Sequence, residues 1–266
     1  MARYFLRLAY RGAPFHGWQV QPNAVSVQGE IERALSVVLR IPVSIVGAGR
    51  TDTGVNARVM YAHFDYDGIL PDSRRLLVSL NRLVGRDIAI HAVLPVHDDA
   101  HARFDAVERM YKYFVTFEKT PFFYPMSWHC PNGLDIRRMN EAASILLKTD
   151  DFTSFAKLHS DSKTNICRVS KAEWAMVGDS AAVFTITADR FLRNMVRAVV
   201  GTLVDVGRGK LTLDEFRGII ERKNRCAAGQ SMPGEALFLW DVRYPYISSE
   251  SRHCVELPGL NLMPGI

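Results

Sequence analysis

The sequence lacks the long apolar runs and paired cysteines that mark membrane proteins and disulfide-rich proteins. No uninterrupted apolar stretch approaches the ~20 residues of a membrane helix, and the best candidate, residues 195–206, contains an arginine, a glycine and an aspartate. Residues 1–11 carry an arginine at every fourth position, so we expect no signal peptide there. The four cysteines lie far apart in 266 residues, which argues against a disulfide framework and favours a reducing, cytoplasmic compartment.

Two nucleotide-binding motifs are also missing, although a Gly-rich stretch is present. Residues 46–57 have the sequence Val-Gly-Ala-Gly-Arg-Thr-Asp-Thr-Gly-Val-Asn-Ala. They lack the third glycine of a dinucleotide fingerprint and the Gly-Lys-Ser/Thr of a phosphate loop. They do place Arg50 two residues from Asp52, in a loop whose glycines allow close approach to a ligand. This is either a polar turn with a surface ion pair or a site where an arginine keeps a carboxylate ionised.

Charge is modest overall but unevenly distributed. Hydrophobic residues make up 48% of the chain and charged residues 23%, with a net charge of +5, which permits a nucleic-acid partner without requiring one. Basic residues cluster late in the chain, where arginine forks suit phosphate recognition but also suit a solvated basic face. The cluster comprises Arg190, Arg193, Arg197, Arg208 and Lys210.

A polar run at residues 97–101, His-Asp-Asp-Ala-His, resembles a metal-binding cluster superficially. No further ligand set with helical spacing accompanies it, so solvated polar surface is the simpler interpretation. A metal-dependent hydrolase using His97, Asp98, Asp99 and His101 remains an alternative, which insensitivity of the activity to a chelator would remove.

Hydrophobic periodicity predicts an α+β protein. Residues 1–96 are expected to run strand, helix, strand, strand, helix, strand, an order typical of a ferredoxin-like unit with helices on one face of an antiparallel sheet. The strands are expected at 4–10, 41–46, 59–64 and 88–96, and the helices from Ser26 to before Pro42 and at 73–83.

The rest of the chain again mixes helices with antiparallel strands. We place a half boundary in the Pro- and aromatic-rich residues 121–131, giving an N-terminal half over 1–120, a C-terminal half over 121–247 and a tail over 248–266. Strands are expected at 109–118 and 236–243, a hairpin at 167–176 and 181–189, and helices at 135–148, 192–206 and 213–223. Arg193 and Arg197 are expected one turn apart on the same helix.

Several motifs, in order along nearly the whole chain, resemble the TruA family of transfer RNA pseudouridine synthases. They are Gly-Arg-Thr-Asp-Thr-Gly-Val-Asn-Ala at 49–57, His-Ala-Arg-Phe-Asp-Ala at 101–106, Arg109-x-Tyr111-x-Tyr113, Asp-Phe-Thr-Ser-Phe at 151–155, the run 191–203 and Ala-Leu-Phe-Leu from Ala236. The family loop more usually has Asp-Ala-Gly-Val-His, so Asn56 stands where a histidine is common.

The resemblance implies a cofactor-free isomerase that converts uridine to pseudouridine around positions 38, 39 and 40 of the anticodon stem-loop. It implies a homodimer with two ferredoxin-like (RRM-like) halves and a central basic cleft that binds tRNA. Asp52 matches the catalytic carboxylate, acting as nucleophile or as base for a glycal route.

Two further residues take roles from the same resemblance, and a third is assigned beside them. Tyr111 matches the tyrosine that lies on the base, and Arg197 matches the arginine that pairs with the aspartate. Arg50 is assigned to phosphate contact or base flipping.

A non-catalytic RNA-binding protein with two RRM-like halves is the other alternative, although the expected aromatic RNP run is missing.

Overall fold

The computed structural model describes residues 1–158 and 163–248, which form two compact units. The first unit contains residues 1–107 together with 239–248, and the second contains residues 108–238. Within the described residues there are five α-helices and a mostly antiparallel open sheet, so the predicted α+β class is confirmed. No helix in these ranges is both long and apolar enough to cross a membrane.

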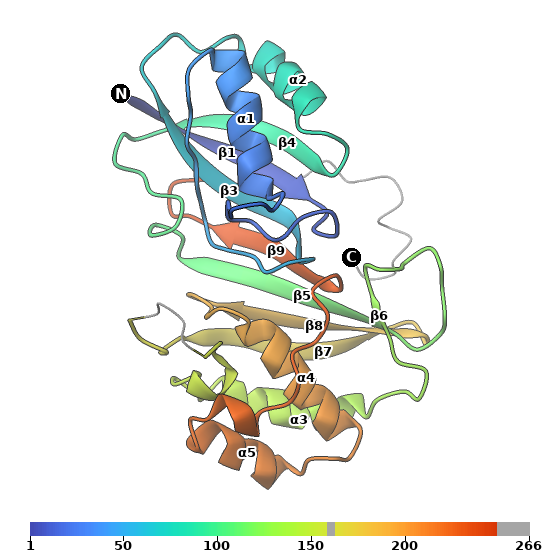
Figure 1. Ribbon diagram of the computed structural model, residues 1–266. Helices are drawn as coiled ribbons and strands as arrows, with labels where there is room; N and C mark the ends of the chain where they lie inside the picture. The colour runs from blue at the N-terminus through green and yellow to red at the C-terminus, as the bar shows by residue number, and fades with distance from the viewer. Residues whose placement is uncertain (159–162, 249–266) are drawn as a thin grey trace. The chain divides into compact units, whose positions relative to one another are not determined.

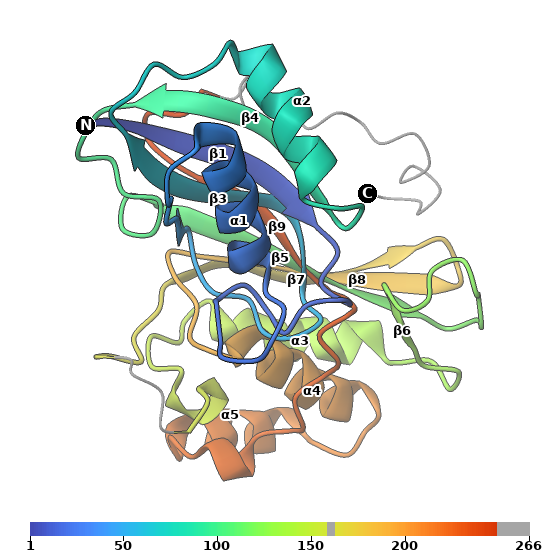
Figure 2. The ribbon, with the colours of Figure 1, turned by 45° about the horizontal axis from the view of Figure 1, so that its top comes forward.

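The first unit has an antiparallel sheet with α1 and α2 on one face (Figures 1 and 2). Its strand order is β4-β1-β3-β9, with β2 paired to β3; Leu239–Arg243 of β9 belong to this unit. The elements are β1 (Ala2–Tyr10), α1 (Val27–Leu39), β2 (Val46–Gly47), β3 (Asn56–Tyr66), α2 (Ser73–Leu83), β4 (Ile88–Val96) and β9 (Leu237–Arg243).

Helix α1 illustrates how local sequence sets these bounds. The hydroxyl of Ser26 accepts the amide of Gly29 at 3.2 Å, which satisfies one of the donors left open at a helix start. The helix ends where Arg40 adopts a left-handed φ of 57°. Its apolar stripe faces the core, with Val27, Ile31, Ala34, Leu35 and Leu39 all buried.

The strand predicted at 41–46 is wrong, because only Val46–Gly47 form β2. The backbone amides just before it donate to side chains of α1 instead of to a neighbouring strand. Val43 donates to the Ser36 hydroxyl at 2.9 Å, and Ile45 donates to the Glu32 carboxylate at 2.9 Å. Residues 41–45 are therefore a connection tied to the helix.

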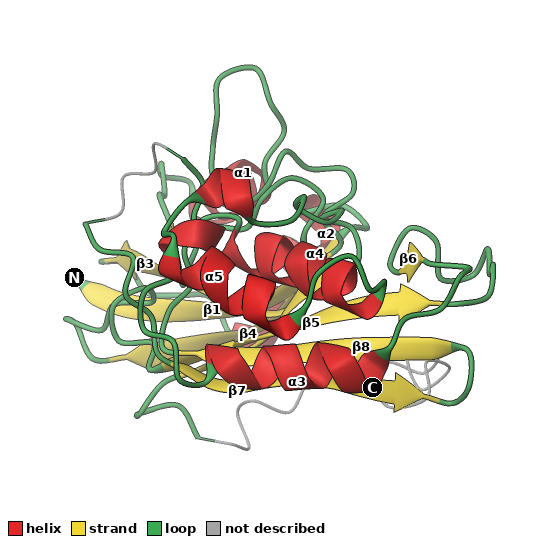
Figure 3. Cartoon of the chain, turned by 90° about the horizontal axis from the view of Figure 1, so that it is seen from below, coloured by secondary structure: helices red, strands yellow, loops and turns green. Residues whose placement is uncertain are grey.

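The second unit has the strand order β5-β8-β7, with the short β6 running parallel to β5. Helix α3 lies along β7 and beside α4 (Figure 3), and the hairpin predicted around Gly178 is confirmed. The elements are β5 (Glu108–Thr116), β6 (Trp128–His129), α3 (Ile136–Leu146), η1 (Thr153–Phe155), β7 (Val169–Val177), β8 (Ala181–Ala188), α4 (Met195–Gly207), α5 (Leu213–Glu221) and η2 (Arg225–Ala227).

Two expectations for these helices are wrong. Helix α4 begins at Met195 and not at Leu192, because Asn194 adopts a left-handed φ of 65°. The side-chain amide of Asn194 donates to the Ser231 hydroxyl at 2.6 Å. Arg193 thus precedes the helix and does not share its face with Arg197. The helix predicted at 135–148 is observed as α3 over Ile136–Leu146, so Leu147 follows the helix and is 47% exposed.

The predicted tail, residues 248–266, lies outside the described residues apart from Ser248.

Two helical glycines give opposite expectations for stability. A Cβ on Gly201 of α4 would overlap the carbonyl oxygen of Gln230, whereas a Cβ on Gly218 of α5 would meet only the end of the Arg222 side chain at 3.4 Å. We expect Gly201→Ala to lower the free energy of unfolding by about 2 kcal/mol through overpacking. Gly218→Ala should raise it by about 0.5–1 kcal/mol, since alanine loses less entropy in a helix.

Urea unfolding of both variants beside the parent protein checks this pair. An equal change in midpoint for the two substitutions would contradict the close packing of α4 against residues 230–232.

Candidate functional site

The Gly-rich loop between β2 and β3 is anchored by hydrogen bonds to other segments of its own unit. The amide of Ala48 donates to the carbonyl of Tyr61 at 2.7 Å. The hydroxyls of Tyr10 and Thr51 are 2.7 Å apart in a buried hydrogen bond, and the amide of Trp18 donates to the Thr51 carbonyl at 3.2 Å. The loop is therefore anchored on both sides of Arg50.

A second loop, residues 11–18, packs directly against the Gly-rich loop. Gly17 has a φ of 96°, and a Cβ there would lie 2.6 Å from the Thr51 carbonyl oxygen. A Cβ on Gly12 would overlap the carbonyl oxygen of Val55. Both positions therefore require glycine, because two backbones are in contact there. The sequence pattern around Gly12 and Gly17 did not predict this contact.

The glycines inside the Gly-rich loop divide between packing and open space. A Cβ on Gly47 would come within 2.6–2.7 Å of the Trp18 ring, so this glycine makes room for the indole. Gly49 has nothing within 4 Å of its Cβ position. The close approach to a ligand predicted for this loop is consequently available at Gly49 and not at Gly47.

Asp52 stands at a tight turn in this loop. The amide of Val55 donates to the Asp52 carbonyl at 3.2 Å, and Gly54 supplies the positive φ of 79° that the turn requires. The Asp52 side chain is half-buried, whereas Arg50 is exposed. The turn therefore fixes the backbone from which the candidate carboxylate extends.

Asn56, the departure from the family loop, is only 2% exposed. Its side-chain oxygen accepts the backbone amide of Gly12 at 2.8 Å in a buried hydrogen bond. Asn56 thus connects the Gly-rich loop to residues 11–18, a structural role that the sequence comparison with the family did not suggest.

The other two candidate residues belong to the second unit. Tyr111 on β5 is half-buried, and its ring meets the Phe191 ring edge-on, with centroids 5.1 Å apart. Arg197, in the first turn of α4, donates from Nε to the Met232 carbonyl at 2.6 Å. Arg50 and Asp52 share one loop of the first unit, and the pairing of Arg197 with Asp52 stays a prediction.

Tyr113, two residues after Tyr111, is fully buried and belongs to the core. Its hydroxyl has no hydrogen-bond partner within the described part of the chain. Burial raises the pKa of this hydroxyl above its usual value; the positive charge of Arg197 opposes the rise, and Glu235 adds to it. Tyr113 therefore stays protonated and neutral.

The histidines of the metal-like run are occupied by hydrogen bonds. His97 bonds to Asp99 through Nδ1, and the Nδ1 of His101 accepts the amides of Arg103 and Phe104 at 3.1 and 3.2 Å. Across residues 1–158 and 163–248, no group of three or more His, Cys, Asp or Glu side chains is placed to hold a metal. The hydrolase alternative has no support in this geometry.

His63 on β3 supports the same segment. Its Nδ1 accepts the amide of Ala102 at 3.1 Å, which requires that nitrogen to be unprotonated, and its ring lies 4.7 Å from that of His101. Burial lowers the pKa of His63 to about 4, with further lowering by Arg3 and His101. A charged imidazole is disfavoured here by both its surroundings and its hydrogen bond.

This arrangement predicts a loss of stability in mildly acidic solution. Because the folded pKa of His63 lies below the unfolded value of about 6.5, the unfolded chain binds more protons between these values, and stability falls as pH drops from about 6.5 to 4. The contribution of His63 is up to about 3 kcal/mol.

Urea unfolding from pH 7 to pH 4 measures the effect. His63→Gln retains an acceptor but cannot titrate, so it should flatten the curve relative to that of the parent protein. An unchanged pH dependence in His63→Gln would contradict the assignment.

Comparison with known proteins agrees with these motifs. A family model described as tRNA pseudouridine synthase matches residues 142–245. The tRNA pseudouridine synthase A of Parabacteroides distasonis is 56% identical over 245 residues, covering 92% of this chain and 97% of the relative. The protein of that name from Bacteroides fragilis is 55% identical over 91% of this chain and 96% of its own length.

A more distant relative covers the same extent. The tRNA pseudouridine synthase A of Bacillus subtilis is 40% identical over 243 residues, which is 89% of this chain and 97% of the relative. The similarity therefore runs through both units and beyond the residues matched by the family model. The chain belongs to the TruA family of tRNA pseudouridine synthases.

Proposed function

We propose that this protein converts uridine to pseudouridine around positions 38, 39 and 40 of the anticodon stem-loop of tRNA, with Asp52 as the catalytic carboxylate. The observation that carries the proposal is the near full-length similarity to enzymes named tRNA pseudouridine synthase A. The geometry adds a half-buried aspartate on an anchored loop, and the same loop has open space at the Cβ position of Gly49.

The reaction is an isomerisation, so its atoms balance without an oxidant or reductant. The bond from ribose carbon 1′ to uracil nitrogen 1 breaks, the base turns, and carbon 1′ bonds to carbon 5. The hydrogen leaves carbon 5 as a proton, and nitrogen 1 gains a proton. We assign no cofactor to these steps.

In these reaction steps we assign Asp52 the role of an ionised carboxylate. It either attacks carbon 1′ to form a covalent intermediate or removes a proton from the sugar to form a glycal. Both routes need the carboxylate held in one place while the base turns, and the hydrogen bonds at Thr51 and the turn closed by Val55 supply that rigidity.

The other candidate residues serve binding and electrostatics in this proposal. A flipped uridine needs a surface on which to stack, and Tyr111 beside Phe191 supplies an aromatic one. A guanidinium has five donors; Arg197 gives one to Met232, and we assign others to Asp52. Arg50, exposed on the loop, is assigned to phosphate contact or base flipping.

The wider assignments rest on the family. They are two ferredoxin-like halves, a basic cleft for the tRNA and a homodimer. The boundaries of the halves at 1–120 and 121–247 rest instead on the Pro- and aromatic-rich residues 121–131, and the cytoplasmic location rests on the four separated cysteines. The small net positive charge of +5 is compatible with a polyanionic partner.

Replacing the candidate carboxylate tests the mechanism. Asp52→Asn keeps the shape of the side chain but removes its charge, so we expect isomerisation to fall by at least about 10³-fold while the affinity for tRNA changes by less than about threefold. Release of tritium from tRNA labelled at uracil carbon 5 measures the reaction.

Asp179→Asn, in the exposed turn of the β7–β8 hairpin, is the matched control and should retain full activity. Activity of Asp52→Asn within tenfold of the parent protein would remove Asp52 from the mechanism.

The Asn56 contact gives a second expectation for the same assay. Asn56→Ala leaves the amide of Gly12 without this acceptor, so we expect a loss of about 1–3 kcal/mol in unfolding free energy and a roughly tenfold loss of activity. Asn56→His restores a ring nitrogen that can accept and should recover most of both. Equal damage by the two substitutions would show that the hydrogen bond to Gly12 is not what Asn56 supplies.

A further inference from the structure

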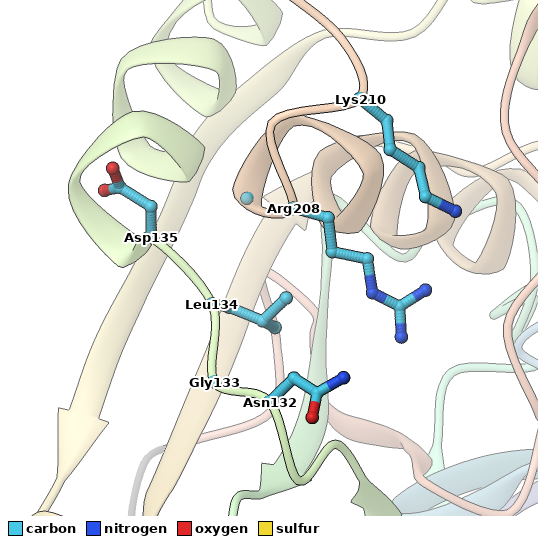
Figure 4. Close-up of a pocket in the computed structure, with 7 residues that line it drawn as sticks. Asn132, Gly133, Leu134, Asp135, Arg208 and Lys210 are labelled. Carbon is cyan, nitrogen blue, oxygen red and sulfur yellow. The ribbon is translucent and has the colours of Figure 1, made fainter.

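An open cavity of about 700 Å³ lies on the surface of the second unit, and its lining includes neither Tyr111 nor Arg197. Its lining comes from residues 132–135, which lead into α3, and from Gly207, Arg208 and Lys210 at the end of α4 (Figure 4). The volume falls in the range of sites that hold small molecules. It can accommodate a phosphate together with its attached sugar.

Two cations dominate the lining. Figure 4 shows the side chains of Arg208 and Lys210 extending from the same turn, with the Asn132 amide beside the arginine. Both cations are exposed, and neither makes an ion pair with a carboxylate in residues 1–158 or 163–248. Their charge is therefore not neutralised by the protein.

The arginine is oriented by contacts that leave its charge intact. Its guanidinium lies 5.3 Å from the centroid of the Trp128 ring, in a cation–π contact, and one terminal nitrogen lies 3.9 Å from the Cys130 sulfur. Such contacts restrict the side chain and reduce the entropy lost when it binds an anion.

The backbone around the cavity is also fixed. The amide of Asp135 donates to the Gly207 carbonyl at 3.0 Å, which ties the start of α3 to the end of α4. Gly209 turns the chain with a φ of 70°, and the amide of Lys210 donates to the Asp205 carbonyl at 2.9 Å. The two cations thus extend from a constrained turn.

One acidic residue lines the cavity but does not face the cations. The Asp135 carboxylate accepts the amide of Arg138 at 2.9 Å as the cap of α3. Figure 4 shows this carboxylate directed away from Arg208 and Lys210. The space beside the two cations therefore favours an anion.

We propose that this cavity binds a phosphodiester of the tRNA backbone, held by Arg208 and Lys210. The proposal rests on the proposed function, which makes tRNA the anionic partner. A guanidinium fork suits two phosphate oxygens at once, and an ammonium adds a point charge. Backbone contacts of this kind position an RNA without selecting its sequence, so the site orients the substrate and takes no part in bond breaking.

The binding experiment measures the Kd of the parent protein and of Arg208→Ala/Lys210→Ala for unmodified tRNA between 50 and 200 mM salt. Each phosphate contact contributes a slope of about −0.7 to −0.9 in log affinity against log salt. We expect the double variant to bind about tenfold or more weakly at the lower salt and to lose about one unit of slope.

The control is Arg137→Ala/Arg217→Ala, which also removes two positive charges from the second unit. These arginines pair with Glu141 at 3.0 Å and with Asp214 at 2.6 Å on helix surfaces. The control should bind tRNA with nearly the parent's affinity and slope. Equal losses in the two double variants would overturn the site and leave only a general charge effect.

Two further experiments cover an unstable double variant and the binding of a small free anion. If the Arg208/Lys210 double variant unfolds at the assay temperature, Lys210→Glu, at an exposed position, replaces it and should weaken binding further than Lys210→Ala. Inorganic phosphate and uridine monophosphate are titrated into the parent protein. If they bind at this site while tRNA affinity is indifferent to the substitutions, the cavity takes a small free anion and the RNA contact is wrong.

Tritium release by the parent protein separates this proposal from the proposed function. If the parent protein isomerises uridine and the Arg208/Lys210 double variant binds tRNA as tightly as the parent does, the phosphate site is refuted and the proposed function is not. A parent protein that binds no tRNA refutes both.

Discussion

The candidate active loop depends on one contact, the packing of residues 11–18 against the Gly-rich loop. The backbones approach so closely at Gly12 and Gly17 that a side chain would not fit at either position. Two hydrogen bonds hold this contact: the amide of Gly12 donates to the side-chain oxygen of Asn56 at 2.8 Å, and the amide of Trp18 donates to the Thr51 carbonyl at 3.2 Å. Just before this segment, the hydroxyls of Tyr10 and Thr51 form a buried hydrogen bond of 2.7 Å. Because buried polar groups are costly to leave unpaired, the contact restricts movement of the backbone that carries Asp52.

That rigidity suits an isomerisation better than a binding role. In the proposed reaction the base leaves carbon 1′ and returns through a different atom, so the carboxylate must keep its place while the substrate moves. Preorganised groups of this kind accelerate reactions because they do not need to reorganise in the transition state. A non-catalytic RNA-binding protein has no comparable need for a half-buried acid, whose charge repels phosphate.

Much of the fold could be predicted from periodicity, because the helices carry clear apolar stripes and the hairpin has a glycine turn. The prediction of α2 at 73–83 and β4 at 88–96 agrees with the structure at both ends. It failed at residues 41–45, where Ser36 and Glu32 take amides that the apolar pattern assigns to a strand. It also failed at Asn194, since a left-handed residue interrupts an otherwise helical run.

The candidate site divides in the same way. The family was predictable from residues 49–57 and the motifs that follow them, whereas the catalytic role of Asp52 stays a proposal. The supporting residues were not predictable, because the signal for Gly12 and Asn56 is a backbone approach between segments about 40 residues apart. The cavity at Arg208 and Lys210 was foreseen only as part of a basic cluster; its shape depends on how α3 and α4 meet.

The central claim, that this chain makes pseudouridine in the anticodon stem-loop, is tested most directly by mapping pseudouridine in tRNA from cells that lack its gene. The account predicts unmodified uridine at positions 38, 39 and 40, with pseudouridine restored there when the gene is returned. Unchanged pseudouridine at those positions, or its loss only elsewhere in the tRNA, would contradict the account.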